Sequence, residues 1–156
     1  MKGVSGEVLT ESEIITVERA CLRLVHEFNH RADERDDEGV VALFTQDCLY
    51  EPAGRQVEGK AALRAALAAS PPNRGMVHMS SDVIVDVVDA TSATGRGHVL
   101  IAEIFGSERA PVRFASFADE YRLTDEGWRI HQRRLRHKLT PVTDSGRPDQ
   151  TTGAQG

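Results

Sequence analysis

The stretch ESEIITVERACLRLVHEFNHRADER, residues 11–35, decides how this chain folds. Its apolar residues recur at helical spacing, so the stretch predicts a long N-terminal helix that Thr10 or Ser12 can cap. They form two flanks roughly 100° apart around the helix axis. One flank holds Ile14, Val17, Cys21, Leu24 and Phe28, and the second holds Ile15, Leu22 and Val25. A helix that is apolar on two sides is normally enclosed by other elements, so we expect this one to lie inside the fold.

The segments after this helix change from helical to strand patterns. A short helix is predicted over Glu38–Thr45, a strand over Asp47–Glu51 and an alanine-rich helix over Lys60–Ser70, which Pro71 ends. Runs rich in β-branched residues then predict four strands. These are Val77–Val88, His98–Phe105, Val112–Leu123 and Trp128–Leu139, with Gly95-Arg96-Gly97 as a turn before the second and Asp125-Glu126-Gly127 as the last hairpin turn. Helices followed by consecutive strands favour an α+β fold with an antiparallel sheet.

The length and composition of the chain fit one globular domain. The chain has 156 residues, of which 40% are hydrophobic and 28% charged. We interpret residues 1–10 as a flexible lead, residues 11–140 as the domain and residues 141–156 as a disordered tail. The net charge of −5 argues against a nucleic-acid partner, because nucleic-acid-binding proteins carry basic patches.

Other features of the sequence narrow the class of protein further. No run approaches the roughly 18 apolar residues of a membrane span, and residues 1–10 hold no signal-peptide core. Cys21 and Cys48 have no CxxC spacing, so we interpret them as buried free thiols of a cytoplasmic protein. No nucleotide-binding motif occurs, and no cofactor is expected.

Candidate acid–base residues cluster near the end of the first helix. On a continued helix Asp33 shares a flank with Leu22, His26 and Asn29. A carboxylate beside an imidazole orients the ring and makes it a usable general base, although Asp33 can equally be a polar residue that closes the helix.

Other polar side chains lie on predicted strands. His98 alternates with Leu100, Ala102 and Ile104, and is either a second acid–base group or a core histidine. Phe28, Tyr50 and Tyr121 are candidate substrate-binding residues, although strand tyrosines more often pack in the core. The basic run Arg133–Lys138 is interpreted as an exposed strand edge.

The spacing of His26, His30 and Asp33 can also ligate a divalent metal, but no further ligand is evident in the sequence. We therefore expect no metal.

Four stretches resemble the SnoaL-like branch of the nuclear transport factor 2-like superfamily. They are HEFNHRADERDDEGVVALFTQDCLYE (26–51), VEGKAALRAALAA (57–69), VHMSSDVIVDV (77–87) and FADEYRLTDEGWRIHQRRL (117–135). The resemblance implies a cone-shaped α+β barrel, in which a strongly curved antiparallel sheet wraps around the first helix and encloses a pocket. It also places Asp33 and His78 on the positions of a catalytic aspartate–histidine pair. The chain departs from some relatives at Ala32, Asp82 and His98.

The function that this resemblance implies is a cofactor-free lyase of the dehydratase or cyclase type. Its substrate would be a small, hydrophobic, oxygenated molecule, as in natural-product, aromatic or steroid metabolism. Two alternatives stay open: a non-catalytic module that binds a small molecule or supports a partner subunit, and a ketosteroid isomerase-like enzyme that uses Asp33 alone as the base. Strands with apolar residues on both faces also predict a homodimer formed through the open face of the sheet.

Overall fold

A computed structural model describes residues 8–72, 74–105, 108–109 and 112–139 of the chain. The lead at residues 1–7 and the tail at 141–156 lie outside these residues. The described elements, in chain order, are α1 (Glu11–Asp33), α2 (Asp37–Ala42), β1 (Phe44–Glu51), β2 (Val57–Glu58), α3 (Gly59–Ala68), β3 (Arg74–Val87), β4 (Ser92–Phe105), β5 (Glu108–Arg109), β6 (Arg113–Thr124) and β7 (Gly127–Leu139).

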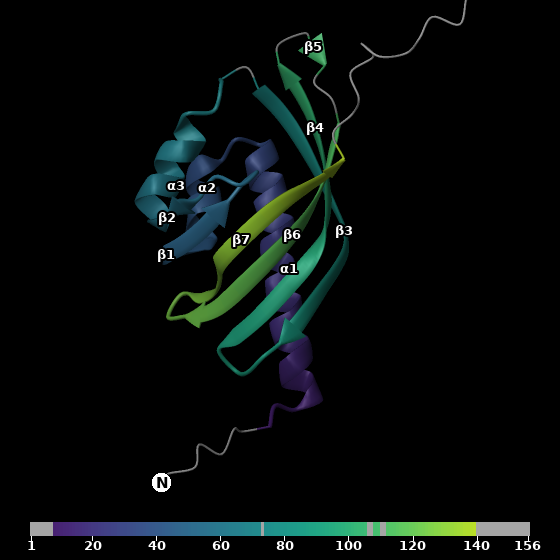
Figure 1. Ribbon diagram of the computed structural model, residues 1–156. Helices are drawn as coiled ribbons and strands as arrows, with labels where there is room; N and C mark the ends of the chain where they lie inside the picture. The colour runs from purple at the N-terminus through teal and green to yellow at the C-terminus, as the bar shows by residue number, and fades with distance from the viewer. Residues whose placement is uncertain (1–7, 73, 106–107, 110–111, 140–156) are drawn as a thin grey trace, which may run out of the picture.

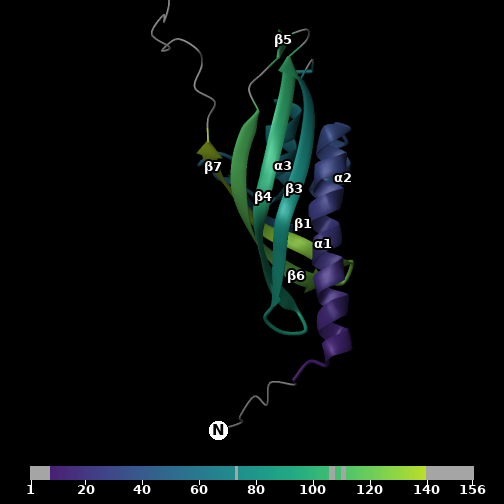
Figure 2. The same cartoon turned by 90° about the vertical axis from the view of Figure 1, so that its right-hand side faces the viewer.

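Helix α1 forms as predicted and Thr10 caps it. The Thr10 hydroxyl accepts a hydrogen bond from the Glu13 backbone N–H, and the Glu13 carboxylate accepts one from the Thr10 backbone N–H. The first apolar flank is buried from Val17 to Phe28. The second flank is only partly enclosed, because Ile15 is 45% exposed. The helix runs along β3 with one side open, as Figure 2 shows. Val25 of the second flank is nevertheless buried, so the expected burial of both flanks holds in part.

The sheet has the order β2-β1-β7-β6-β4-β3, and β5 pairs with β4. It curls around the helices, which lie on its concave side (Figure 1). The predicted α+β fold with a curved sheet is therefore confirmed. One pair differs from the antiparallel expectation: β1 and β7 run parallel. These strands lie far apart in the sequence, and this pair closes the sheet on the side of the short helices.

A bulge in β3 contributes to the curvature of the sheet. The register with β4 shifts between Ser81 and Ile84, and Asp82 adopts a left-handed φ of 52°. Residues 74, 76, 78 and 80 face inward before the bulge, whereas residues 83, 85 and 87 do so after it. Such a bulge inserts an extra residue, bends the strand and increases its twist. Aspartate tolerates the left-handed conformation better than most residues.

The segment Gly95-Arg96-Gly97 is not a turn, which corrects the sequence-based expectation. Both glycines lie within β4, and the turn to β3 is at residues 88–91 instead. The glycines leave room for aromatic rings from β6. A Cβ atom on Gly95 would lie 2.7 Å from the Tyr121 hydroxyl oxygen, and one on Gly97 would lie 2.7 Å from the Phe117 ring. These glycines are required for the packing of the two rings and do not mark a turn.

The remaining boundaries follow the sequence closely. The predicted short helix ends earlier, at Ala42, because Phe44 and Thr45 already belong to β1. Cys21 and Cys48 are free and buried, as expected. Burial also raises the pKa of Cys21 to about 12. Within the described ranges, none of the helices is sufficiently long and apolar for a membrane crossing.

The role of Gly97 can be tested by substitution with alanine. Gly97→Ala should lower the free energy of unfolding by about 1–3 kcal/mol, because the added methyl group overlaps the Phe117 ring. Urea denaturation followed by circular dichroism measures the change. The exposed Thr94 on the same strand serves as the control site, and an equal loss in Thr94→Ala would contradict the packing role of Gly97.

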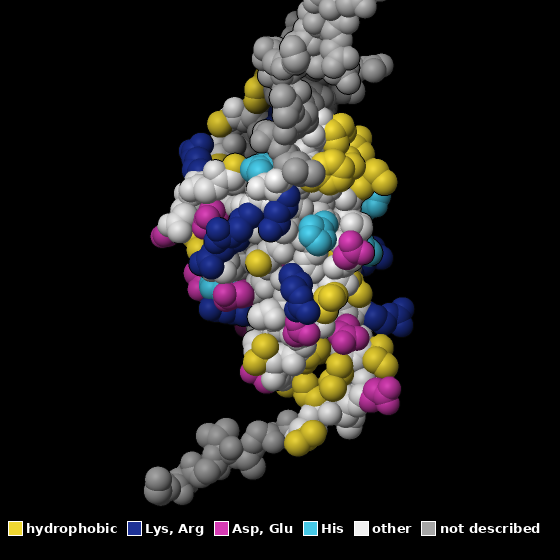
Figure 3. Space-filling view, turned by 45° about the vertical axis from the view of Figure 1, so that its right-hand side comes forward, with side chains coloured by type: hydrophobic (Ala, Val, Ile, Leu, Met, Phe, Trp, Pro, Cys, Tyr) yellow, Lys and Arg dark blue, Asp and Glu magenta, His cyan; other side chains and the backbone are white. Residues whose placement is uncertain are grey.

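The outer face of the sheet carries exposed apolar side chains, which gather into a patch in Figure 3. Val77 is 54% exposed, Met79 63% and Phe114 46%. We propose that a second copy of the chain covers this face, since a two-fold axis lets one strip of apolar side chains meet its own copy.

Light scattering tests this proposal. At micromolar concentration the chain should have the mass of a dimer, and Met79→Asp should shift it towards the monomer. Gln46→Asp, on the exposed side of β1, is the matched control. A monomeric wild-type chain would contradict the proposal.

Candidate active site

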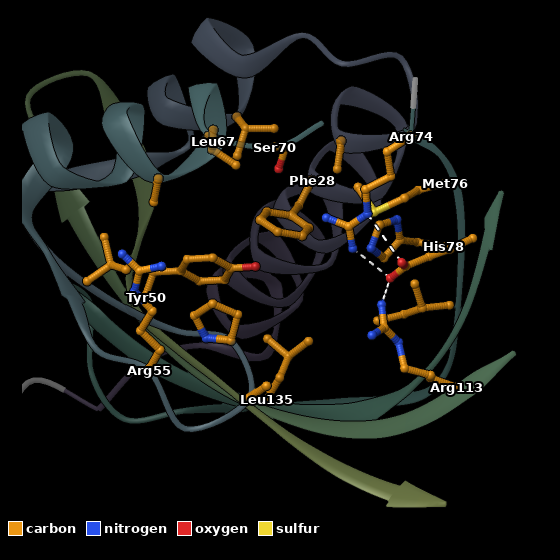
Figure 4. Close-up of a pocket in the computed structure, with 18 of the residues that line it drawn as sticks. Phe28, Tyr50, Arg55, Leu67, Ser70, Arg74, Met76, His78, Arg113 and Leu135 are labelled. Atoms are coloured by element: carbon orange, nitrogen blue, oxygen red, sulfur yellow. Dashed lines mark hydrogen bonds and ion pairs between the residues drawn. The ribbon is translucent and has the colours of Figure 1, made fainter. Parts of the chain in front are cut away.

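A cavity of about 270 Å³ lies between the concave face of the sheet and the helices. Apolar side chains line most of it, and polar groups from β1, β3, β4 and β6 project into it (Figure 4). A mainly apolar pocket with a few converging polar groups is the usual form of a small-molecule site. The lining residues used below are Phe28, Tyr50, Arg55, Arg74, His78, Glu103 and Arg113.

Asp33 and His78 meet at the wall of this cavity. The Asp33 Oδ1 atom lies 2.6 Å from His78 Nδ1. The two Asp33 oxygens also accept the backbone N–H of His78 at 3.1 and 3.0 Å. An ionised carboxylate is only an acceptor, so beside it Nδ1 is the donor of this contact, and in a neutral imidazole Nε2 then has the free lone pair. The predicted proximity of the two residues is confirmed.

The end of α1 is fixed against β3 at two further points. Asn29, one turn before Asp33, donates from its amide nitrogen to the Ser80 hydroxyl at 2.8 Å. Arg35, just after the helix, donates to the Pro71 carbonyl at 2.6 Å and to the Arg74 carbonyl at 3.3 Å. Since residues 29 and 33 are four apart, they share one helix face and meet alternate inward positions of β3. These contacts hold Asp33 beside His78.

Tyr50 and Phe28 also line the cavity, and their role as substrate-binding residues stays a prediction. Tyr50 extends from β1 and points its hydroxyl into the cavity (Figure 4). Burial raises the pKa of the Tyr50 phenol, against smaller opposing effects of Arg133 and Arg74. The hydroxyl is therefore neutral at physiological pH and can donate a hydrogen bond. The Phe28 ring lies 6.1 Å from that of Tyr50 and 6.4 Å from that of His78.

His98 and Tyr121 do not join this site. Inward positions on β4 are odd-numbered, so the His98 side chain points outward and is 59% exposed, 3.7 Å from Asp82. Both expectations for His98, an acid–base group in the pocket or a core histidine, are wrong because the alternation places Val99 and Ile101 inward instead. Tyr121 faces inward but is only 1% exposed, and its hydroxyl donates to Asp119 at 2.7 Å. It belongs to the core and does not line the cavity.

The alternative metal site is not assembled. His26 and His30 are exposed, whereas Asp33 is turned towards His78. Over the described ranges, no three His, Cys, Asp or Glu side chains come together in a way that could hold a metal ion.

A buried ion pair was missed from the sequence. The interpretation of the run Arg133–Lys138 as an exposed edge holds for residues 136–138, which are exposed and lie beyond the pairing of β7 with β1, but it is wrong for Arg133, which is only 3% exposed. Its guanidinium donates to both oxygens of Asp119, at 2.9 and 2.5 Å. It also stacks 4.3 Å from the centre of the Phe28 ring. Burial acts to lower the pKa of Arg133, but Asp119 outweighs it, so the guanidinium stays charged.

A second charged cluster was also missed. Glu103, which is 4% exposed, lies in the cavity wall between Arg74 and Arg113 and pairs with both. The alternation of inward and outward side chains along β3, β4 and β6 could have placed all three residues inward. That inference would have required the register between the strands, which the sequence does not give.

Together, this fold and cavity define a class of small α+β proteins with a pocket inside a curved sheet. A family model described as a SnoaL-like domain matches residues 13–134, and the chain belongs to this family. The resemblance seen in the sequence is thereby confirmed. No curated protein matches the chain.

Solved structures show the same fold. A protein provisionally assigned as a scytalone dehydratase, from Novosphingobium aromaticivorans DSM 12444, is 22% identical, with a TM-score of 0.77 over 94% of this chain and 100% of that one. A type 2 hexachlorocyclohexane dehydrochlorinase (LinA) is 16% identical, with a TM-score of 0.76 over 90% and 99% of the two chains. A provisionally assigned dehydratase of the NTF2-like family, from Streptomyces avermitilis, is 16% identical, with a TM-score of 0.72 over 81% and 99%.

The buried pair beneath the cavity yields a stability prediction. Arg133→Met should lower the free energy of unfolding by about 3–5 kcal/mol, because it leaves the Asp119 carboxylate buried without its partner. Thermal or urea denaturation measures the loss. Arg136→Met, at an exposed position of the same strand, should change the free energy by less than about 0.5 kcal/mol. Similar losses in both variants would refute a special role for the buried pair.

Proposed function

We propose that the protein is a cofactor-free lyase that acts on a small, hydrophobic, oxygenated molecule, with His78 as the general base and Asp33 as the residue that orients it. The observation that carries the proposal is the 2.6 Å contact between Asp33 Oδ1 and His78 Nδ1 at the cavity wall. The names of the structural neighbours, a dehydratase and a dehydrochlorinase, belong to the same reaction type.

The proposed reaction is an elimination. His78 Nε2 removes a proton from an acidic carbon of the substrate, and the C–H electron pair forms a carbon–carbon double bond. The bond from the adjacent carbon to a hydroxyl group breaks, and the hydroxyl leaves with its electron pair. The imidazolium then returns the proton to this oxygen, which releases water and restores the neutral base. With a halide leaving group, the proton passes to solvent instead.

The remaining groups of the cavity suit this chemistry. The neutral Tyr50 hydroxyl can donate a hydrogen bond to a carbonyl or leaving oxygen of the substrate. The apolar lining excludes water, which strengthens the polar contacts that remain. A placed acid–base group typically contributes about 10²–10⁴-fold to the rate.

The isomerase alternative is less well supported. Both Asp33 oxygens accept hydrogen bonds from His78, and Asp33 does not line the cavity. A carboxylate so engaged is badly placed to take a proton from a bound substrate, whereas the His78 ring lines the cavity directly. The binding-module alternative is decided by whether proton transfer occurs at all.

Proton exchange tests the base without knowledge of the leaving group. Exchange of C–H for C–D in 1-tetralone, followed by NMR in D2O, requires only an effective base. Scytalone and hexachlorocyclohexane, with loss of water or chloride as the readout, extend the panel. The wild-type chain should accelerate at least one of these reactions, and His78→Ala should slow it by about 10²-fold or more. A chain that accelerates none of them would favour the binding module.

Asp33→Asn requires a stability control. An asparagine offers one oxygen and an amide donor, so it cannot replace both acceptors that Asp33 presents to His78. Its rate should therefore be compared at a temperature at which the variant is folded, as judged by circular dichroism. The double variant should be little worse than His78→Ala, because residues that act as one unit lose most of their effect at the first removal. Additive losses, or a mild His78→Ala, would rule out the coupled pair.

A further inference from the structure

Three neighbouring strands bring charged side chains together in the cavity wall. Arg74 is on β3, Glu103 on β4 and Arg113 on β6. The Arg74 guanidinium donates to Glu103 at 2.6 and 3.2 Å, and Arg113 forms an ion pair with the same carboxylate. In Figure 4, dashed lines run from the labelled Arg74 and Arg113 side chains to one carboxylate between them. One buried carboxylate is thus shared by two cations.

The charge balance of the cavity is positive. Of the described lining residues, Arg55, Arg74 and Arg113 are cationic and only Glu103 is anionic. This contrasts with the chain as a whole, which has a net charge of −5. An acidic protein repels anions at long range, so a locally cationic cavity points to a specific role for these arginines.

Arg113 pairs with Glu103 but keeps an unsatisfied donor. Burial lowers the pKa of its guanidinium, and the nearby Arg74 lowers it further. Its Nε atom is buried and has no hydrogen-bond partner among the described residues. The Arg113 side chain is 31% exposed, so an anion in the cavity can reach the accessible part of its guanidinium and supply a further acceptor.

The register places this cluster within reach of the base. His78 pairs with Ile101, which in turn pairs with Arg113. The backbones of His78 and Arg113 are therefore two strand spacings, or about 10 Å, apart, and both side chains project into the same cavity. One bicyclic ligand can span that distance.

We propose that the substrate of this cavity carries a carboxylate, which binds at Arg113 beside Glu103 and Arg74, at the end of the molecule remote from the carbon that meets His78. This inference deepens the proposed lyase function. It rests on that function because a molecule bound here is a substrate only if the protein is an enzyme. The substrate class is then a small, hydrophobic carboxylic acid. Arg55, exposed and among the lining residues, adds to the attraction of such anions.

A matched pair of probes tests the carboxylate site by calorimetry. The wild-type chain should bind 2-naphthoate about 10-fold or more tightly than 2-naphthamide, which has the same shape without the charge. Arg113→Gln should reduce this ratio to near one while the affinity for 2-naphthamide changes little. Arg113→Lys should retain much of the preference, and Arg136→Gln, at an exposed site, should retain all of it. Because Arg74 still pairs with Glu103 in Arg113→Gln, we expect that variant to fold.

The outcomes separate this inference from the proposed function. Equal affinities for the two probes, no binding of 2-naphthoate at millimolar concentration, or a preference that survives Arg113→Gln would each overturn the carboxylate site. His78→Ala should leave the preference intact, because binding at Arg113 needs no proton transfer. A failed exchange assay with an intact preference would remove only the lyase proposal, and the reverse result would remove only the carboxylate site.

Discussion

The hydrogen bonds between Asp33 and the residue His78 hold both the fold and the candidate site in place. The carboxylate accepts the backbone N–H and lies 2.6 Å from the ring nitrogen Nδ1. The backbone contacts hold the end of α1 to β3, on the concave side of the sheet. The ring contact fixes which imidazole nitrogen faces the cavity. One side chain therefore contributes to folding and to chemistry, and its substitution must affect both.

Two charged groupings surround this pair and differ in purpose. Arg133 and Asp119 are matched one to one in the core, with Phe28 and Tyr121 packed around them. This balance lets the pair be buried without a residual charge. Glu103 is shared between Arg74 and Arg113, and this grouping lines the open cavity. The first grouping is complete without a ligand, whereas the second offers an unsatisfied donor.

The shape of the sheet keeps the filled core apart from the open cavity. The bulge at Asp82 changes which residues of β3 face inward, and the inward glycines of β4 leave room for the rings of Phe117 and Tyr121. The half of the sheet near those rings is filled by side chains. The other half, around His78, stays open as the cavity. A fold in which every inward position carried a large side chain would have no room for a ligand.

Much of the architecture was determined by the sequence itself. Helical spacing located α1, β-branched runs located the long strands, and Thr10 marked a cap, because these signals are local in the chain. The pairing of Asp33 with His78 came from family resemblance, since 45 residues separate them and no local pattern connects them. Only the tertiary structure decided which face each strand residue occupies. It turned His98 outward, buried Arg133 and gathered Arg74, Glu103 and Arg113, because strand register and bulges depend on contacts between distant segments.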